Sequence, residues 1–122
     1  MKGIGIDICN VKRFERLTEN NSFINKIFTE NEIIYCNSRK RKKSEVFAVR
    51  FAAKEAFAKA LGTGFRKGIS LKEIEIKKDE LGKPSIVLYG NTKDFFESQV
   101  GGTIYLSLSH EKETAIAMVV IE

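Results

Sequence analysis

The chain has 122 residues, of which 43% are hydrophobic and 30% charged. This length is typical of one domain, so we expect a single domain over residues 1–122. The composition is that of a globular fold and excludes a disordered or collagen-like chain. No apolar run approaches the ~18 residues that a membrane-spanning helix needs, and the first residues lack the apolar stretch of a secretory signal.

The charged and sulfur-containing residues narrow the class of protein further. Two cysteines and one histidine are too few for a disulfide framework or a zinc cluster. The sequence therefore predicts a cytoplasmic protein with reduced thiols. The net charge of +5 favours an anionic partner, such as a nucleic acid, a nucleotide, an anionic membrane or an acidic protein, without choosing among them.

The first half of the chain reads mainly as helices that follow one strand. Residues 2–9 alternate with a period of two and predict a strand, with three isoleucines on one face and Gly3, Gly5 and Asp7 on the other. A short helix is expected at 11–19.

The longest helix is expected in the middle of the chain. Thr29 and the glutamate three residues later form a capping box that begins a shorter helix. The basic run 39–43 repels itself and predicts an exposed loop, with the alternative that it binds a phosphate or an acidic protein. Ser44 is expected to cap a helix at 45–61, which Gly62 ends.

The second half reads mainly as strands. They are expected at residues 71–77, 86–89, 103–109 and 115–121. Asn91 is expected to cap a short helix between the second and third of them. The last strand is apolar throughout, so we expect it to be buried on both faces. The whole pattern predicts an α+β fold, an antiparallel sheet packed with one long and several short helices.

Four charges on the long helix are the most informative feature. Arg50, Lys54, Glu55 and Lys59 lie among alanines and phenylalanines. The simplest interpretation is an exposed face of ion pairs, each contributing a few tenths of a kcal/mol. The apolar surroundings instead indicate a largely buried helix, whose charges need partners or a metal.

Asp7 is a second candidate, at the end of a glycine-flanked strand. It could simply cap the helix that follows. With Glu55 it could also supply two hard oxygen ligands, which suit Mg²⁺ together with substrate phosphates and water.

Two further motifs could contact phosphate. The loop from Gly62 to Gly64 lacks the P-loop pattern and is at least a helix stop. Ser107, Ser109 and His110 do not suggest a serine nucleophile, because neighbours on a strand point apart and no elbow motif is present. Hydrogen-bond donation to a phosphate suits them better.

These motifs together resemble the holo-acyl-carrier-protein synthases, the small bacterial phosphopantetheinyl transferases. The first signature is Gly5-Ile6-Asp7-Ile8 with Arg13, and the second is the Lys54-Glu55-Ala56 motif ending in Lys59. The Gly62–Gly64 loop, Gly82-Lys83-Pro84 and the Ser107–His110 segment follow in the family's order. Asn10 replaces a glutamate that many members carry at that position.

The resemblance implies a fold, a reaction and roles for individual residues. The fold would be that of the 4′-phosphopantetheinyl transferases. The reaction would be Mg²⁺-dependent transfer of 4′-phosphopantetheine from coenzyme A to a serine of acyl carrier protein, in support of fatty acid biosynthesis, with adenosine 3′,5′-bisphosphate as the other product. Asp7 and Glu55 would hold the metal, and Lys59 would stabilise charge on the pyrophosphate and act in catalysis with Glu55. Arg50, Gly62, Gly64, Ser109 and His110 would bind coenzyme A, and Arg13 would face the carrier protein. The base that takes the serine proton is either Glu55 or a metal-activated water.

The family also implies a homotrimer with active sites between subunits, and neither a nucleic acid nor a membrane partner. A trimer would account for the apolar last strand, whereas a strand buried inside a monomer is the competing explanation. Two other functions stay open from the residues alone: a nucleic-acid-binding module, suggested by the basic run but lacking a known binding motif, and a non-enzymatic assembly domain.

Overall fold

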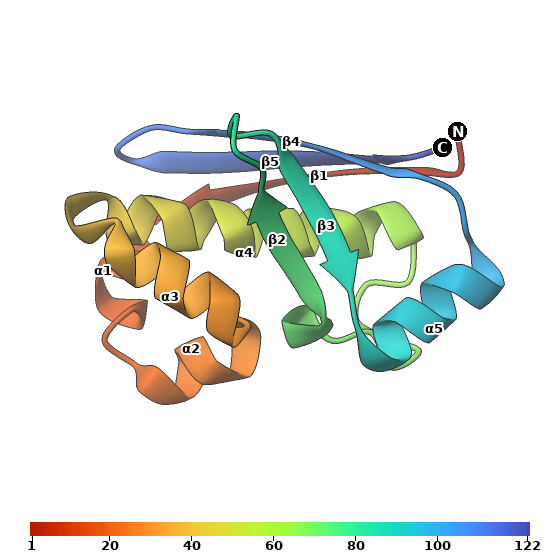
Figure 1. Ribbon diagram of the computed structural model, residues 1–122, viewed down its shortest axis with the longest axis horizontal. Coiled ribbons are helices and arrows are strands. Elements are labelled where there is room, and N and C mark those ends of the chain that lie inside the picture. The colour runs from red at the N-terminus through yellow and green to blue at the C-terminus, as the bar shows by residue number, and fades with distance from the viewer.

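A computed structural model describes all 122 residues, and its one long helix lies between a three-stranded sheet and a layer of shorter elements (Figure 1). The elements in chain order are β1 (Gly3–Asn10), α1 (Val11–Leu17), α2 (Asn21–Ile27), α3 (Glu30–Ser38), the 3-10 helix η1 (Lys40–Lys42), α4 (Lys43–Leu61), the 3-10 helix η2 (Leu71–Glu73), β2 (Ile74–Lys78), β3 (Pro84–Leu88), α5 (Gly90–Gln99), β4 (Ile104–His110) and β5 (Thr114–Ile121).

The three-stranded sheet joins the two ends of the chain. Its order is β1-β5-β4, with every pair antiparallel, and β2 and β3 form a separate antiparallel pair. The sequence therefore predicted the antiparallel α+β class correctly, but the strands form two sheets.

The glycines of β1 allow this strand to lie directly against α4. A methyl group at Gly3 would overlap the carbonyl of Ala60, and one at Gly5 would overlap the carbonyl of Ala56. Any side chain at these two positions would push the strand away from the helix. The predicted close approach on the face that carries Asp7 is confirmed.

Helix α4 is the centre of the hydrophobic core. Twelve of its 19 residues are buried, including Phe47, Phe57 and all six alanines. Gly62 ends the helix in the left-handed conformation at φ 79°, as predicted. The predicted Ser44 cap is wrong: the helix begins at Lys43, with no side-chain cap.

A buried ion pair ties α4 to α3 and β2. Lys54 is fully buried, and its Nζ donates to Glu32 Oε1 at 2.7 Å and to the carbonyl of Leu71 at 2.9 Å. The other oxygen of Glu32 accepts from the backbone N–H of Ile76 at 2.8 Å. Glu32 also completes the predicted capping box with Thr29. The charge on Lys54 is thus satisfied entirely within the fold.

Several other expectations differ from the structure. Residues 71–73, expected in a strand, form η2, and the basic run 39–43, expected as a loop, forms η1 and the first residue of α4. Helix α2 was not predicted, although Asn20 caps it and the side chains of Ile24 and Ile27 are buried on one face. The expected Asn91 cap is wrong, since α5 begins at Gly90 without a side-chain cap, and Glu73 accepts instead from Thr92 N–H and Oγ1 at 3.1 and 2.8 Å. Strand β5 is not buried on both faces, because Met118 on its outer face is 42% exposed.

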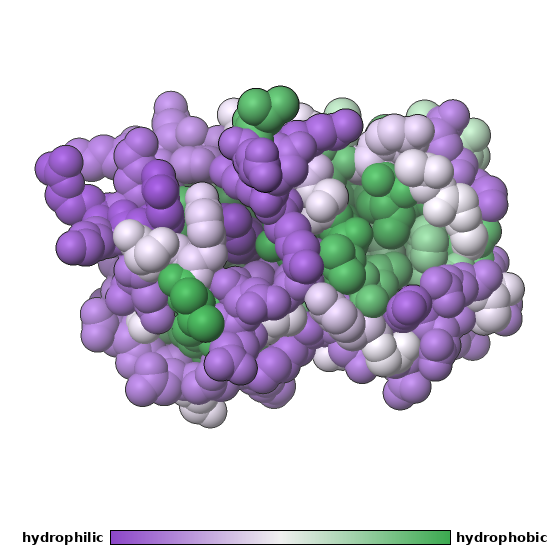
Figure 2. All heavy atoms as spheres, in the orientation of Figure 1, coloured by the Kyte–Doolittle hydropathy of each residue, from purple (hydrophilic) through white to green (hydrophobic).

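The face drawn in Figure 2 is mostly hydrophilic, with one apolar hollow beside β3 and α5. Ile86, Leu88, Phe96 and Ile104 line this groove of about 440 Å³. It borders the β4 edge of the three-stranded sheet, whereas Asp7 lies on β1 at the opposite edge. The groove is therefore separate from the Asp7 region. No helix of the structure combines the length and apolar character needed to cross a membrane.

Candidate active site

Asp7 and Lys59 form the first pair of the candidate site. Asp7 follows the two glycines on the inner face of β1, so its carboxylate reaches α4. Lys59 Nζ donates to Asp7 Oδ1 at 2.9 Å and to the carbonyl of Ile6 at 3.1 Å. The Lys59 side chain is 56% exposed and that of Asp7 only 17%. The lysine is therefore accessible to an anionic ligand, whereas the aspartate side chain is mostly buried against α4.

Glu55 is the second carboxylate of this group, one helical turn before Lys59. Burial raises the pKa of Glu55 above its ordinary value, the negative charge of Asp7 raises it further, and Lys59 opposes both. Its carboxylate takes part in none of the ion pairs of the structure. Two carboxylates with a single exposed ammonium between them favour the arrival of another cation.

The donor set therefore fits a hard divalent cation that is shared with a substrate. Asp7 and Glu55 offer oxygen ligands, which Mg²⁺ prefers, and Mg²⁺ usually completes its shell with water and substrate phosphates. No group of three or more His, Cys, Asp and Glu side chains gathers anywhere in the chain, so a metal site made only of protein ligands is absent.

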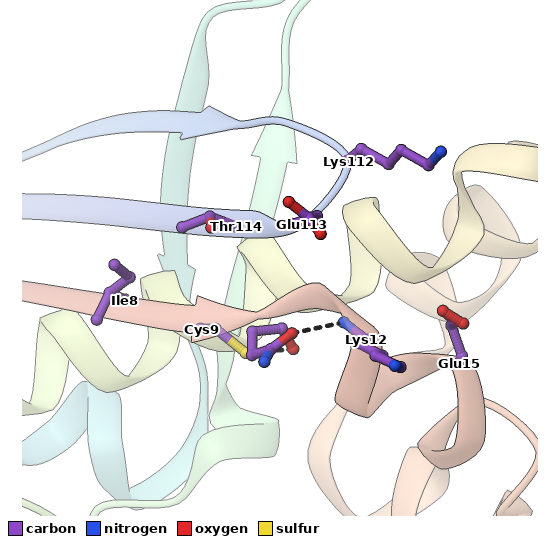
Figure 3. Close-up of a pocket in the computed structure, with 8 residues that line it drawn as sticks. Ile8, Cys9, Lys12, Glu15, Lys112, Glu113 and Thr114 are labelled. Atoms are coloured by element: carbon purple, nitrogen blue, oxygen red, sulfur yellow. Dashed lines mark hydrogen bonds between the residues drawn. The ribbon is translucent and has the colours of Figure 1, made fainter.

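A groove of mixed charge runs beside β1 along α1, and its continuation near Arg13 is basic. Figure 3 shows its wall, where Lys12 and Glu15 of α1 face Lys112 and Glu113 of the turn between β4 and β5. This groove of about 710 Å³ continues into a second of about 510 Å³ that Arg13 lines.

Cys9 lies beneath this groove. Burial raises the pKa of its thiol, and the positive charge of Arg13 opposes the shift. Arg13 lies on α1, which follows β1 directly, and its side chain is exposed. Cys9 and Cys36 are both free and buried, as predicted.

The glycine loop begins at the end of α4, next to Lys59. Gly62 and Gly64 both have positive φ, at 79° and 61°. The N–H of Gly62 donates to the carbonyl of Lys59 at 3.0 Å, and Arg66 Nε donates to the carbonyl of Thr63 at 3.2 Å. The loop therefore lies at the same end of the helix as the carboxylate pair.

His110 lies at the other end of α4. Its Nδ1 is 2.8 Å from Oε1 of Glu45, in the first turn of the helix. Ser109 and His110 line a groove of about 420 Å³ with Thr114 and Ile116. Sequence reasoning missed Glu45, since nothing local in the sequence links residues 65 positions apart.

Arg50 lies apart from both groups. It is 2% exposed, its guanidinium lies 4.4 Å from the ring centre of Tyr35, and its Nη1 donates to the carbonyl of Val46 at 3.2 Å. Its Nε has no hydrogen-bond partner. The structure therefore brings together Asp7, Glu55 and Lys59, but it does not bring Arg50 to them, and the expected role of Arg50 stays a prediction.

Comparisons with known proteins bear on the chemistry of this arrangement. The family model described as the 4′-phosphopantetheinyl transferase superfamily matches residues 3–119. A holo-(acyl-carrier-protein) synthase of Geobacter sp. strain M21 is 47% identical over 122 residues, which cover 98% of this chain and 97% of that protein. One of Ruminiclostridium cellulolyticum is 49% identical over 120 residues, covering 97% and 90%.

Solved structures agree with these relatives. The holo-(acyl-carrier-protein) synthase of Neisseria meningitidis is 40% identical, with a TM-score of 0.89 over 100% of this chain and 98% of that one. The enzyme of Helicobacter pylori, solved in complex with coenzyme A, is 35% identical, with a TM-score of 0.81 over 98% and 99%. The chain therefore belongs to the 4′-phosphopantetheinyl transferase superfamily and, within it, to the holo-acyl-carrier-protein synthases.

Proposed function

We propose that this chain transfers 4′-phosphopantetheine from coenzyme A to a serine of acyl carrier protein in a Mg²⁺-dependent reaction. The observation that carries the proposal is the group formed by Asp7, Glu55 and Lys59, which provides two carboxylates and one exposed ammonium. The products are holo-acyl carrier protein, for use in fatty acid biosynthesis, and adenosine 3′,5′-bisphosphate. The free buried thiols are compatible with the cytoplasm as the location.

The reaction is a displacement at phosphorus. The serine oxygen forms a bond to the phosphorus that carries the pantetheine arm, and the bond from that phosphorus to the bridging oxygen breaks. Such transfers depend mainly on positioning and on neutralising charge. The exposed ammonium of Lys59 would stabilise the charge that develops on the leaving phosphate.

Asp7 and Glu55 would hold the magnesium ion. A bound Mg²⁺ would supply further charge neutralisation at the pyrophosphate. The serine proton passes either to Glu55 or to a water beside it, and the raised pKa of Glu55 brings that carboxylate nearer to the range of an efficient base.

Arg13 belongs to the proposed docking surface for the carrier protein. Lys12, Arg13 and Arg16 are exposed on α1 and line the grooves beside the site. Positive charge on one rim complements an acidic partner and speeds its encounter with the enzyme.

The outer face of the three-stranded sheet supports the proposed trimer. Ile4, Ile6 and Ile8 of β1 are 57%, 54% and 67% exposed, and Met118 and Tyr105 extend the same apolar surface over β5 and β4. An exposed patch of this kind marks an association site.

Shared active sites would also explain the position of His110. Ten residues of helix, about 15 Å of rise, separate its partner Glu45 from Glu55. In a trimer, His110 of one subunit could lie beside Asp7 of a neighbouring subunit.

The test is the intact mass of apo-acyl carrier protein after incubation with the enzyme, coenzyme A and Mg²⁺. We expect a gain of one phosphopantetheinyl group, which a chelator abolishes and excess Mg²⁺ restores. Glu97→Gln, which neutralises an exposed carboxylate on α5, should keep this activity. No gain with several carrier proteins would contradict the proposal.

A further inference from the structure

The Glu45–His110 pair is unusual in its surroundings. Glu45 lies two residues after the basic run 39–43, of which residues 39–42 are exposed, yet its only ion-pair partner is His110. A negative charge beside a basic region lowers the attraction of that region for anions. The presence of Glu45 there therefore calls for a specific role. The side chains of Glu45 and His110 are 16% and 23% exposed, so the pair is held in the fold and is not a loose surface contact.

The geometry determines which ring nitrogen is available to a ligand. A carboxylate can only accept a hydrogen bond, so Nδ1 of His110 must be the donor at 2.8 Å. Nε2 is then the nitrogen left for a ligand in the groove that His110 lines with Ser109 and Thr114. A histidine that donates from both nitrogens carries a positive charge, and the carboxylate of Glu45 balances it.

We infer that Glu45 is a positioning residue, which orients His110 so that Nε2 is presented to a phosphate group of coenzyme A. The inference rests on the proposed function, because it takes the phosphate ligand from that reaction. It adds a role to a residue that has no contact with the Asp7 group, since Glu45 and Glu55 are ten positions apart on α4.

Other charges near the pair do not replace this arrangement. Glu111 and Lys112 lie exposed in the turn after β4, and neither forms an ion pair. Glu111→Ala is therefore a matched control for charge, because Glu111 lines the same groove and carries the same charge as Glu45 but makes no side-chain hydrogen bond to His110.

The first measurement is NMR of the histidine ring nitrogens. The chain has one histidine, so the spectrum reports on His110 alone. We expect the proton on Nδ1 in the unmodified chain and in Glu45→Gln, whose amide oxygen can still accept it. In Glu45→Ala the neutral ring should move toward the Nε2-protonated form. An identical tautomer in Glu45→Ala and the unmodified chain would overturn the inference, whether or not the enzyme is active.

The second measurement is a double-mutant cycle on the transfer reaction. Glu45→Ala should raise KM for coenzyme A about tenfold, the effect of one charge-assisted hydrogen bond, with kcat and KM for the carrier protein within about twofold. Glu45→Gln should recover part of the loss, and Glu111→Ala should not raise KM for coenzyme A, because it removes a negative charge that lines the groove.

The cycle separates positioning from general charge. The double variant Glu45→Ala/His110→Ala should raise KM for coenzyme A no more than His110→Ala does alone. Additive losses, or an equal effect of Glu111→Ala, would overturn the inference and leave the proposed reaction intact. Thermal melting of each variant identifies any loss that comes from unfolding.

Discussion

Lys54 and Glu55 are neighbours in the sequence and belong to two opposite kinds of charged cluster. Lys54 is fully buried, and Glu32 and two backbone carbonyls satisfy its ammonium. Glu55, on another side of the same helix, forms no ion pair, and burial and Asp7 raise its pKa. In the first cluster, Lys54 with Glu32, all charges are paired, and we call it the closed cluster. The second, Asp7 with Glu55 and Lys59, has more negative than positive charge, and we call it the open cluster.

The two clusters differ in whether the fold itself satisfies their charges. In the closed cluster every charge has a partner, so a ligand has nothing to add. In the other, two carboxylates share one ammonium that is more than half exposed, so a cation or a polyanion can change the balance. Binding chemistry is expected where the fold leaves charge uncompensated.

The largest expected effect comes from breaking the closed cluster. Lys54→Met should lower the free energy of unfolding by about 3–5 kcal/mol, because it leaves the Glu32 carboxylate buried without its partner. Urea denaturation measures the loss. Lys54→Met combined with Glu32→Leu should recover much of it, and a double variant as unstable as the single one would contradict this account.

Glu55→Gln should affect activity and leave stability nearly unchanged, the reverse of Lys54→Met. We expect transfer to the carrier protein to fall by about two orders of magnitude or more, because the variant loses the carboxylate proposed to hold the metal, while stability is unchanged or slightly higher. Single-turnover kinetics and urea denaturation test both parts. If the variant retained full transfer, Glu55 would not be part of the site.

The pH dependence of stability should distinguish Glu55 in a third way. The pKa of Glu55 is higher in the folded chain than in the unfolded chain. At pH values between these two pKa values, the folded state therefore binds more protons than the unfolded state. The free energy of unfolding therefore falls as pH rises through this range.

Without metal, Glu55→Gln and the unmodified chain should be equally stable below the ordinary Glu pKa, and the variant should be the more stable at neutral pH. Urea midpoints measured with a chelator from pH 4 to pH 7 test this. Glu97→Gln controls for the general loss of one negative charge, and the same trend in both variants would remove the assignment to Glu55.

The smallest effect is expected at the rim of the open cluster. Arg13→Ala should raise KM for the carrier protein several-fold and leave KM for coenzyme A nearly unchanged, because an exposed charge acts mainly on encounter with the partner. The difference should shrink at high salt. Lys26→Ala on α2 is a control of equal charge, and an equal effect on both substrates would argue against docking at Arg13.

Much of the fold was predictable because its signals are local. The alternation in β1, the capping box at Thr29 and the stop at Gly62 each depend on neighbouring residues, and the structure confirms all three. The helix caps at Ser44 and Asn91 were wrong, since a favourable residue type does not ensure that the chain turns at that position.

The sequence by itself determined the fold class and the family motifs, and it singled out Asp7, Glu55 and Lys59 as candidate site residues, because these depend on residue type and spacing. Only the tertiary structure decided the partners of the charges. Glu32 with Lys54 and Glu45 with His110 are 22 and 65 residues apart. Packing of α3 and β4 against α4 brings them together, and no local pattern encodes that packing. The exposure of the outer face of β5 also became known only from the tertiary structure. An apolar strand has the same sequence pattern whether its second face packs against the same chain or against another copy.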